Sequence, residues 1–166
     1  MRHILRRREI VADDWYHLGE EIPEGCPLII PLAEWRRQPG RWREWPAALG
    51  VRLAPADAPE DLTDELPRLA LVAVEFPGSG DGRGYTLGRL LREDLRFNGE
   101  LRAVGAGVRQ DQVYLMSRCG FDSLELAPGE DLEAARRALQ RYDVAYQPGS
   151  SGAGAGAATP IRAQRF

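Results

Sequence analysis

Residues 69–96 read LALVAVEFPGSGDGRGYTLGRLLREDLR, and this stretch decides the fold class. Its first part, Leu69 to Phe76, is almost entirely apolar, which favours a parallel strand covered on both faces over a half-exposed antiparallel strand. A glycine-rich turn follows, and from Tyr85 to Arg96 the leucines recur on one helical face. The stretch therefore predicts a strand, a turn and a helix, which together form one unit of a parallel α/β sheet.

The same alternation of strands and helices continues on both sides of this unit. About five such units predict a mostly parallel sheet, either open or curved like part of a barrel, because a complete barrel needs eight. Upstream, the expected elements are a strand at 27–32, a helical stretch broken at Pro39-Gly40 and a strand at 50–54. Downstream, they are strands at 100–104 and 123–126, helices at 109–118 and 131–142, and a last short strand at 144–146.

Three regions are expected along the chain. Residues 1–26 form an N-terminal edge segment, with a short hairpin at Ile4-Leu5 and Glu9 to Val11. Residues 27–147 form the α/β domain. Residues 148–166 are rich in Gly and Ala, offer nothing to bury, and predict a disordered tail.

Composition excludes several classes of function. All 22 basic residues are arginine, which removes Schiff-base chemistry and a phosphate-loop lysine. The net charge of -3 makes nucleic acid a poor partner, and no apolar run reaches the length of a membrane span. With two histidines and two distant cysteines, no metal site and no cofactor of recognisable motif is expected. We expect a cytoplasmic protein.

The glycine-rich turn is the main candidate site, since ligands of parallel sheets gather at the carboxyl ends of strands. Its glycines allow close backbone approach, and an arginine at a helix N-terminus suits sulfate, phosphate or carboxylate. The structural alternative is a tight turn in which an aspartate caps the helix. The spacing fits neither GxGxxG nor a Walker loop. The candidate anion-binding residues are Gly80, Asp81, Gly82, Arg83 and Gly84, with Arg109 from the next turn.

Three charged residues lie in or at the end of predicted strands. A charge in a covered strand is costly unless it is paired, so Glu75 is expected to pair with Arg52 or Arg102 near the carboxyl edge. The pair is either structural or orients an anionic ligand. A third hypothesis makes Glu75 the general base of a small barrel-like lyase or isomerase.

Cysteine and tryptophan suggest two further interpretations. Cys119 follows a predicted helix, where the dipole disfavours a thiolate, so we expect a buried structural cysteine and not a redox centre. The region from Trp35 to Trp45, rich in Trp and Arg, either covers the core or docks a partner. Docking would make the chain a non-catalytic interaction module.

Between about Pro27 and Tyr146, an ordered series of motifs resembles the bacterial family called domain of unknown function 934. No one of these motifs is specific alone, but their order is. The motifs are GVRLAP at 50–55, DGRGY at 81–85, RLLR at 89–92, GELRAVG at 99–105 and RCGFD at 118–122.

The resemblance implies a place in assimilatory sulfite reduction, as an oxidoreductase-like protein or as an accessory protein that acts with sulfite reductase. Together with the glycine-rich turn, it leads to the hypothesis that the chain binds a small oxyanion or an anionic cofactor group there. It carries no established catalytic residue. Where such proteins tend to have an aspartate, this chain has Ala106-Gly107. An independent redox enzyme would need a flavin, a nicotinamide or a partner's siroheme to carry electrons.

Overall fold

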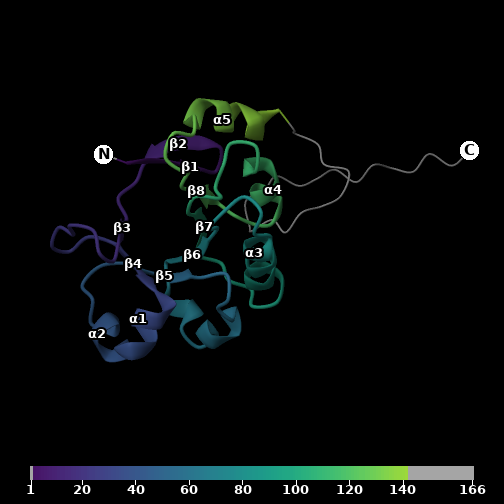
Figure 1. The fold of residues 1–166 in the computed structure, drawn as a ribbon. Coiled ribbons are helices and arrows are strands. Elements are labelled where there is room, and N and C mark those ends of the chain that lie inside the picture. The colour runs from purple at the N-terminus through teal and green to yellow at the C-terminus, as the bar shows by residue number, and fades with distance from the viewer. Residues whose placement is uncertain (1, 142–166) are drawn as a thin grey trace, which may run out of the picture.

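The computed structural model describes residues 2–141 (Figure 1). The expected strand at 144–146 and the expected tail at 148–166 lie outside the described residues. Within 2–141, no helix is both long enough and apolar enough to span a bilayer.

One sheet of eight strands organises the described residues, in the order β2-β1-β8-β7-β6-β5-β4-β3. All strands from β3 to β8 are parallel, and the hairpin of β1 and β2 joins antiparallel beside β8. The predicted α/β class with a mostly parallel sheet is thereby confirmed. The strands are β1 (His3–Arg6), β2 (Glu9–Ala12), β3 (Tyr16–His17), β4 (Leu28–Pro31), β5 (Leu49–Leu53), β6 (Leu71–Glu75), β7 (Glu100–Val104) and β8 (Ser123–Leu124).

The helices lie along the outer side of the sheet (Figure 1). The helix that follows β7 begins at Val113, four residues later than the expected Arg109, because residues 105–112 form turns in which Gln112 N–H donates to the carbonyl of Arg109. The helices are α1 (Leu32–Arg37), α2 (Pro39–Arg43), α3 (Arg83–Glu93), α4 (Val113–Arg118) and α5 (Leu132–Gln140), with short 3-10 turns η1 (Pro59–Leu62) and η2 (Leu66–Arg68).

The sheet curves into a half-barrel. Four strands separate β3 from β8, yet Nε2 of His17 in β3 lies 3.0 Å from Oε2 of Glu125, directly after β8. A flat sheet would hold these side chains well apart, since neighbouring strands are about 4.8 Å apart. Figure 1 shows the strands on an arc, with the purple segment between β2 and β3 running across its open side.

The two faces of the sheet have different cores. On the convex face, alternate strand residues such as Leu101 and Ala103 pack beneath the helices in the large apolar core. On the concave face, Trp15 from the β2–β3 connection packs in a small apolar cluster with Ile29, Leu71, Ala73 and Val104. The chain before β4 therefore fills the hollow of the half-barrel.

Candidate functional site

Two neighbouring turns form the carboxyl edge of the sheet. One links β6 to α3 and holds the glycine-rich motif, and the other links β7 to α4. The backbone N–H of Gly107 donates to the carbonyl of Phe76 over 2.8 Å, and a Cβ at Gly107 would lie 2.7 Å from the carbonyl oxygen of Gly78. The two turns therefore touch at the end of the sheet where ligands usually bind.

The arginine of the glycine-rich turn is already paired. Arg83 Nε donates to Asp81 Oδ1 over 3.0 Å and Nη2 donates to Oδ2 over 2.6 Å, in a two-point ion pair. The same Oδ1 accepts the backbone N–H of Arg83, and hydrogen bonds from Arg83 lower the pKa of the Asp81 carboxyl. Because Arg83 is 61% exposed, an incoming anion could reach its guanidinium, but only by competing with Asp81.

Arg109, in the second turn, is also held by carboxylates. Its Nε lies 3.5 Å from Glu130 Oε1 and 4.0 Å from Asp111 Oδ1. The other oxygen of Glu130 accepts the backbone N–H of Gln110 over 2.7 Å. Both candidate anion-binding arginines thus point to solvent beside a carboxylate of their own chain.

The glycines of the motif have different surroundings. A Cβ on Gly84 would lie 2.5 Å from the ring of Phe76, so packing alone requires glycine there. Around Gly80 and Gly82 no atom lies within 4 Å of the Cβ position, and neither has a positive φ. The protein itself therefore gives no steric reason for glycine at these two positions.

The structure brings Glu75 together with Arg52 but not with Arg102. Arg52 Nε lies 3.7 Å from Glu75 Oε2, and both side chains are about one-third exposed. Arg52 and Arg102 are both level with Ala73 of the strand between them, so register does not separate them, and Arg102 pairs with Asp13 and Glu100 instead. Glu75 as a catalytic base stays a prediction.

Arg102 instead forms a buried network on the concave face. Its Nη1 lies 2.9 Å from Asp13 Oδ1, and both side chains are fully buried. Its Nη2 donates to Glu100 Oε1 over 2.8 Å, and the Ser123 hydroxyl donates to the same oxygen over 2.6 Å. The cost of burying these charges is offset by this mutual pairing.

Glu125 and His17 close the half-barrel above this network. Burial raises the pKa of the Glu125 carboxyl, but the hydrogen bond from His17 and the charges of His17, Arg2 and Arg102 outweigh it, so the net shift is downward. Arg2 lies 3.4 Å from Glu125 and 2.9 Å from Asp13, which joins the rim to the interior. Sequence reasoning missed this group, although Arg102 in a covered strand was a signal of an interior ion pair.

The cysteine and tryptophan candidates are mostly buried. Cys119 ends α4 within the core, and burial raises the pKa of its thiol, which suits the expected structural role. Trp35 and Trp42 are core residues, and the Trp45 indole N–H donates to the carbonyl of Cys26. The indoles of Trp35 and Trp42 are therefore not a surface for docking.

Within residues 2–141, no group of three His, Cys, Asp or Glu side chains is placed to hold a metal ion.

No curated protein matches the chain. A family model described as bacterial protein of unknown function (DUF934) matches residues 50–155, more than half of the 166 residues. The matched region covers β5 to α5 and both turns of the carboxyl edge. The chain belongs to the DUF934 family.

Proposed function

We propose that this chain is an accessory protein of assimilatory sulfite reduction and binds a small oxyanion at the turn between β6 and α3. The metabolic setting comes from the family resemblance. The observation that carries the binding site is the open space around Gly80 and Gly82 beside the exposed guanidinium of Arg83. Glycine is expected where a ligand must approach the backbone closely.

The ion pair within the turn indicates how an oxyanion binds. The carboxylate of Asp81 presents two oxygens to the Arg83 fork, as sulfite or sulfate also would. Asp81 therefore serves as an internal substitute for the ligand. Both side chains lie at the surface of the turn, where breaking such a pair costs little. The anion replaces the carboxylate at the N-terminus of α3, where the helix dipole favours negative charge.

The proposal assigns binding to this chain and electron transfer to its partner. Sulfite reductase supplies the redox group, and the carboxyl edge delivers or retains the oxyanion beside it. Arg109 on the neighbouring turn, itself beside Glu130, provides a second exposed guanidinium at the same edge.

Calorimetric titration with sulfite under anaerobic conditions tests the binding site. Charge-assisted hydrogen bonds contribute roughly 1.5–3 kcal/mol, so Arg83→Ala should weaken binding about ten- to a hundredfold. Asp81→Asn should tighten binding, because it removes the competing charge. Arg89→Ala is the matched control, since Arg89 is an exposed, ion-paired arginine of the same helix. If Arg83→Ala binds sulfite as tightly as the unchanged chain, the site is wrong.

Growth on sulfite as the sole sulfur source tests the metabolic role. Cells that depend on this gene should grow poorly with the Arg83→Ala variant and normally with Arg89→Ala. A pull-down should recover sulfite reductase, identified by the absorbance of its siroheme. Normal growth without the gene, together with no recovered reductase, would reject the role while leaving anion binding open.

A further inference from the structure

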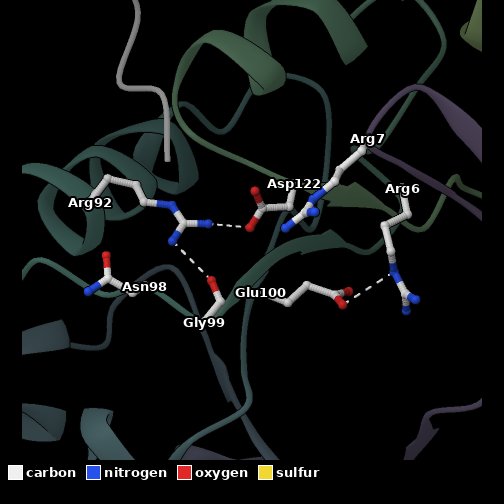
Figure 2. A pocket seen from close by; sticks show the side chains of 7 residues that line it. All are labelled: Arg6, Arg7, Arg92, Asn98, Gly99, Glu100 and Asp122. Atoms are coloured by element: carbon white, nitrogen blue, oxygen red, sulfur yellow. Dashed lines mark hydrogen bonds and ion pairs between the residues drawn. The ribbon is translucent and has the colours of Figure 1, made fainter. Parts of the chain in front are cut away.

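The opposite end of the sheet holds a pocket of about 260 Å³, shown in Figure 2. Its walls come from segments far apart in the chain: Arg6 and Arg7 at the end of β1, Arg92 from α3, residues 98–100 at the start of β7, and Asp122 before β8. This is the amino end of the strands, away from the glycine-rich turn. Three arginines and two carboxylates therefore surround one small hollow.

Arg92 and Asp122 form a neutral wall. Arg92 is 6% exposed, and its guanidinium donates to Asp122 and to the backbone carbonyls of Phe97, Gly99 and Gly120. Asp122 also accepts the backbone N–H of Leu101 over 2.9 Å. These bonds fix the end of α3 to the start of β7. Because Arg92 and Asp122 carry opposite charges, the pair adds no net charge to the pocket.

Glu100 has partners both in the interior and in the pocket. Its Oε1 accepts from Arg102 and from the Ser123 hydroxyl in the buried network. Its Oε2 lies 3.3 Å from Arg6 Nε, which is buried without a well-directed hydrogen bond. Because Arg102 is shared between Glu100 and Asp13, Arg6 serves as a second counter-ion of Glu100 and is not an excess charge.

Arg7 is the excess positive charge of the pocket. Within residues 2–141, its side chain makes no hydrogen bond or ion pair, and Figure 2 shows it extending toward the middle of the pocket beside Asp122. The exposed amide of Asn98 adds a neutral donor at the rim. The pocket thus offers the guanidinium of Arg7, which has no carboxylate partner there, beside the guanidinium of Arg6, which is shared with Glu100.

The backbone at Arg7 is unfavourable for arginine. The two-residue turn between β1 and β2 has φ of 49° at Arg7 and 71° at Arg8. Such turns normally carry Asn-Gly, because positive φ is costly for side chains with a Cβ. Strain of this kind at a pocket wall indicates that the side chain is kept for a purpose other than stability.

We propose that this pocket binds a small tetrahedral oxyanion, held by Arg7 with Arg6 beside it. Its volume lies just below the roughly 300–1,000 Å³ of typical small-molecule sites, which leaves room for a phosphate or sulfate group. The group is either a free ion or the terminal phosphate of a larger molecule that extends into solvent. The site is separate from the proposed oxyanion site at the carboxyl edge and does not depend on it.

Titration with inorganic phosphate, followed by ³¹P NMR and calorimetry, tests the proposal on Arg7→Asn. Asparagine tolerates positive φ, so this variant should melt at a higher temperature while binding phosphate at least about tenfold more weakly. Arg8→Gly is the matched control, because it relieves the same strain and keeps Arg7. It should raise the melting temperature and leave phosphate binding unchanged.

Two outcomes would overturn the site. If Arg7→Asn binds phosphate as tightly as the unchanged chain, Arg7 is not part of the site. If Arg83→Ala loses phosphate binding, the ion binds at the carboxyl edge and not in this pocket. Glycerol phosphate separates the two sources of the ligand. Competition between glycerol phosphate and inorganic phosphate supports a terminal phosphate group, and binding of inorganic phosphate alone supports a free ion.

Discussion

Leu101 and Arg102 are neighbours in β7 and are both fully buried, but on opposite faces of the sheet. Leu101 lies on the convex face, in a core of apolar side chains beneath the helices. Arg102 lies on the concave face, between the carboxylates of Asp13 and Glu100. One strand therefore faces two interiors of different chemistry.

The difference follows from what the chain supplies to each face. Every strand from β4 onward is followed by a helix or helical turn that covers the convex face with apolar side chains. Within residues 2–141, the concave face is covered by the connection from β2 to β3, with Trp15 as its large apolar residue. Arginine suits the remaining space, because its long stem fills volume while its guanidinium pairs with carboxylates. A half-barrel can thus be sealed by ion pairs where a full barrel would use stacked apolar layers.

Among the variants that test this comparison, Arg102→Met is expected to lower the free energy of unfolding the most. Removing one partner of a buried ion pair costs about 3–5 kcal/mol, because Asp13 and Glu100 lose the fully buried guanidinium that they share. The free energy of unfolding in urea should fall by that amount.

A second variant separates lost charge balance from lost packing. Arg102→Met combined with Asp13→Asn and Glu100→Gln removes the stranded carboxylates and should recover part of the stability. Arg89→Ala, at an exposed position, should change stability by less than about 0.5 kcal/mol. A loss of under 1 kcal/mol for Arg102→Met would show that the concave network contributes little.

Gly84→Ala tests the convex face at the glycine-rich turn. Its Cβ would meet the Phe76 ring at 2.5 Å, and overpacking of this kind costs about 1–3 kcal/mol. Gly80→Ala is the matched control, since its Cβ would enter open space and should change stability by under about 0.5 kcal/mol. Urea unfolding measures both, and equal losses would contradict the distinction between a packing glycine and a ligand-facing one. The same Gly80→Ala variant should weaken sulfite binding.

Local patterns predicted the convex half of the fold well. The apolar run from Leu71 to Val74 and the leucines of α3 determine their structure through neighbours close in the chain. The pairing of Glu75 with Arg52 is likewise favoured by adjacent parallel strands. Register left Arg52 and Arg102 equally placed, since both are level with Ala73, and the pairing of Arg102 with Asp13 and Glu100 decides between them.

The concave half could not be predicted in the same way. Arg102 was recognisable as a charge that needs a partner, but Asp13 lies 89 residues away and reaches it only because the sheet curves. The triplet Arg6-Arg7-Arg8 gives no sign of positive φ, since hairpin turns are normally recognised by Asn-Gly. Curvature, which no local pattern encodes, decides which side chains meet inside the half-barrel.

Glu125→Gln gives the smallest effect and tests how the two edges of the half-barrel are joined. The folded pKa of Glu125 is lowered by His17, Arg2 and Arg102 against the cost of burial, so its charge stabilises the fold above the unfolded value of about 4.3. The unchanged chain should exceed the variant in free energy of unfolding by about 1 kcal/mol at pH 7 and pH 5. That advantage should be lost as the pH falls through the folded pKa, because the carboxyl is then protonated in both states. Urea unfolding at pH 7, 5 and 3 measures the difference, and an advantage that persists undiminished at pH 3 would mean that the contact with His17 works through packing and not through charge.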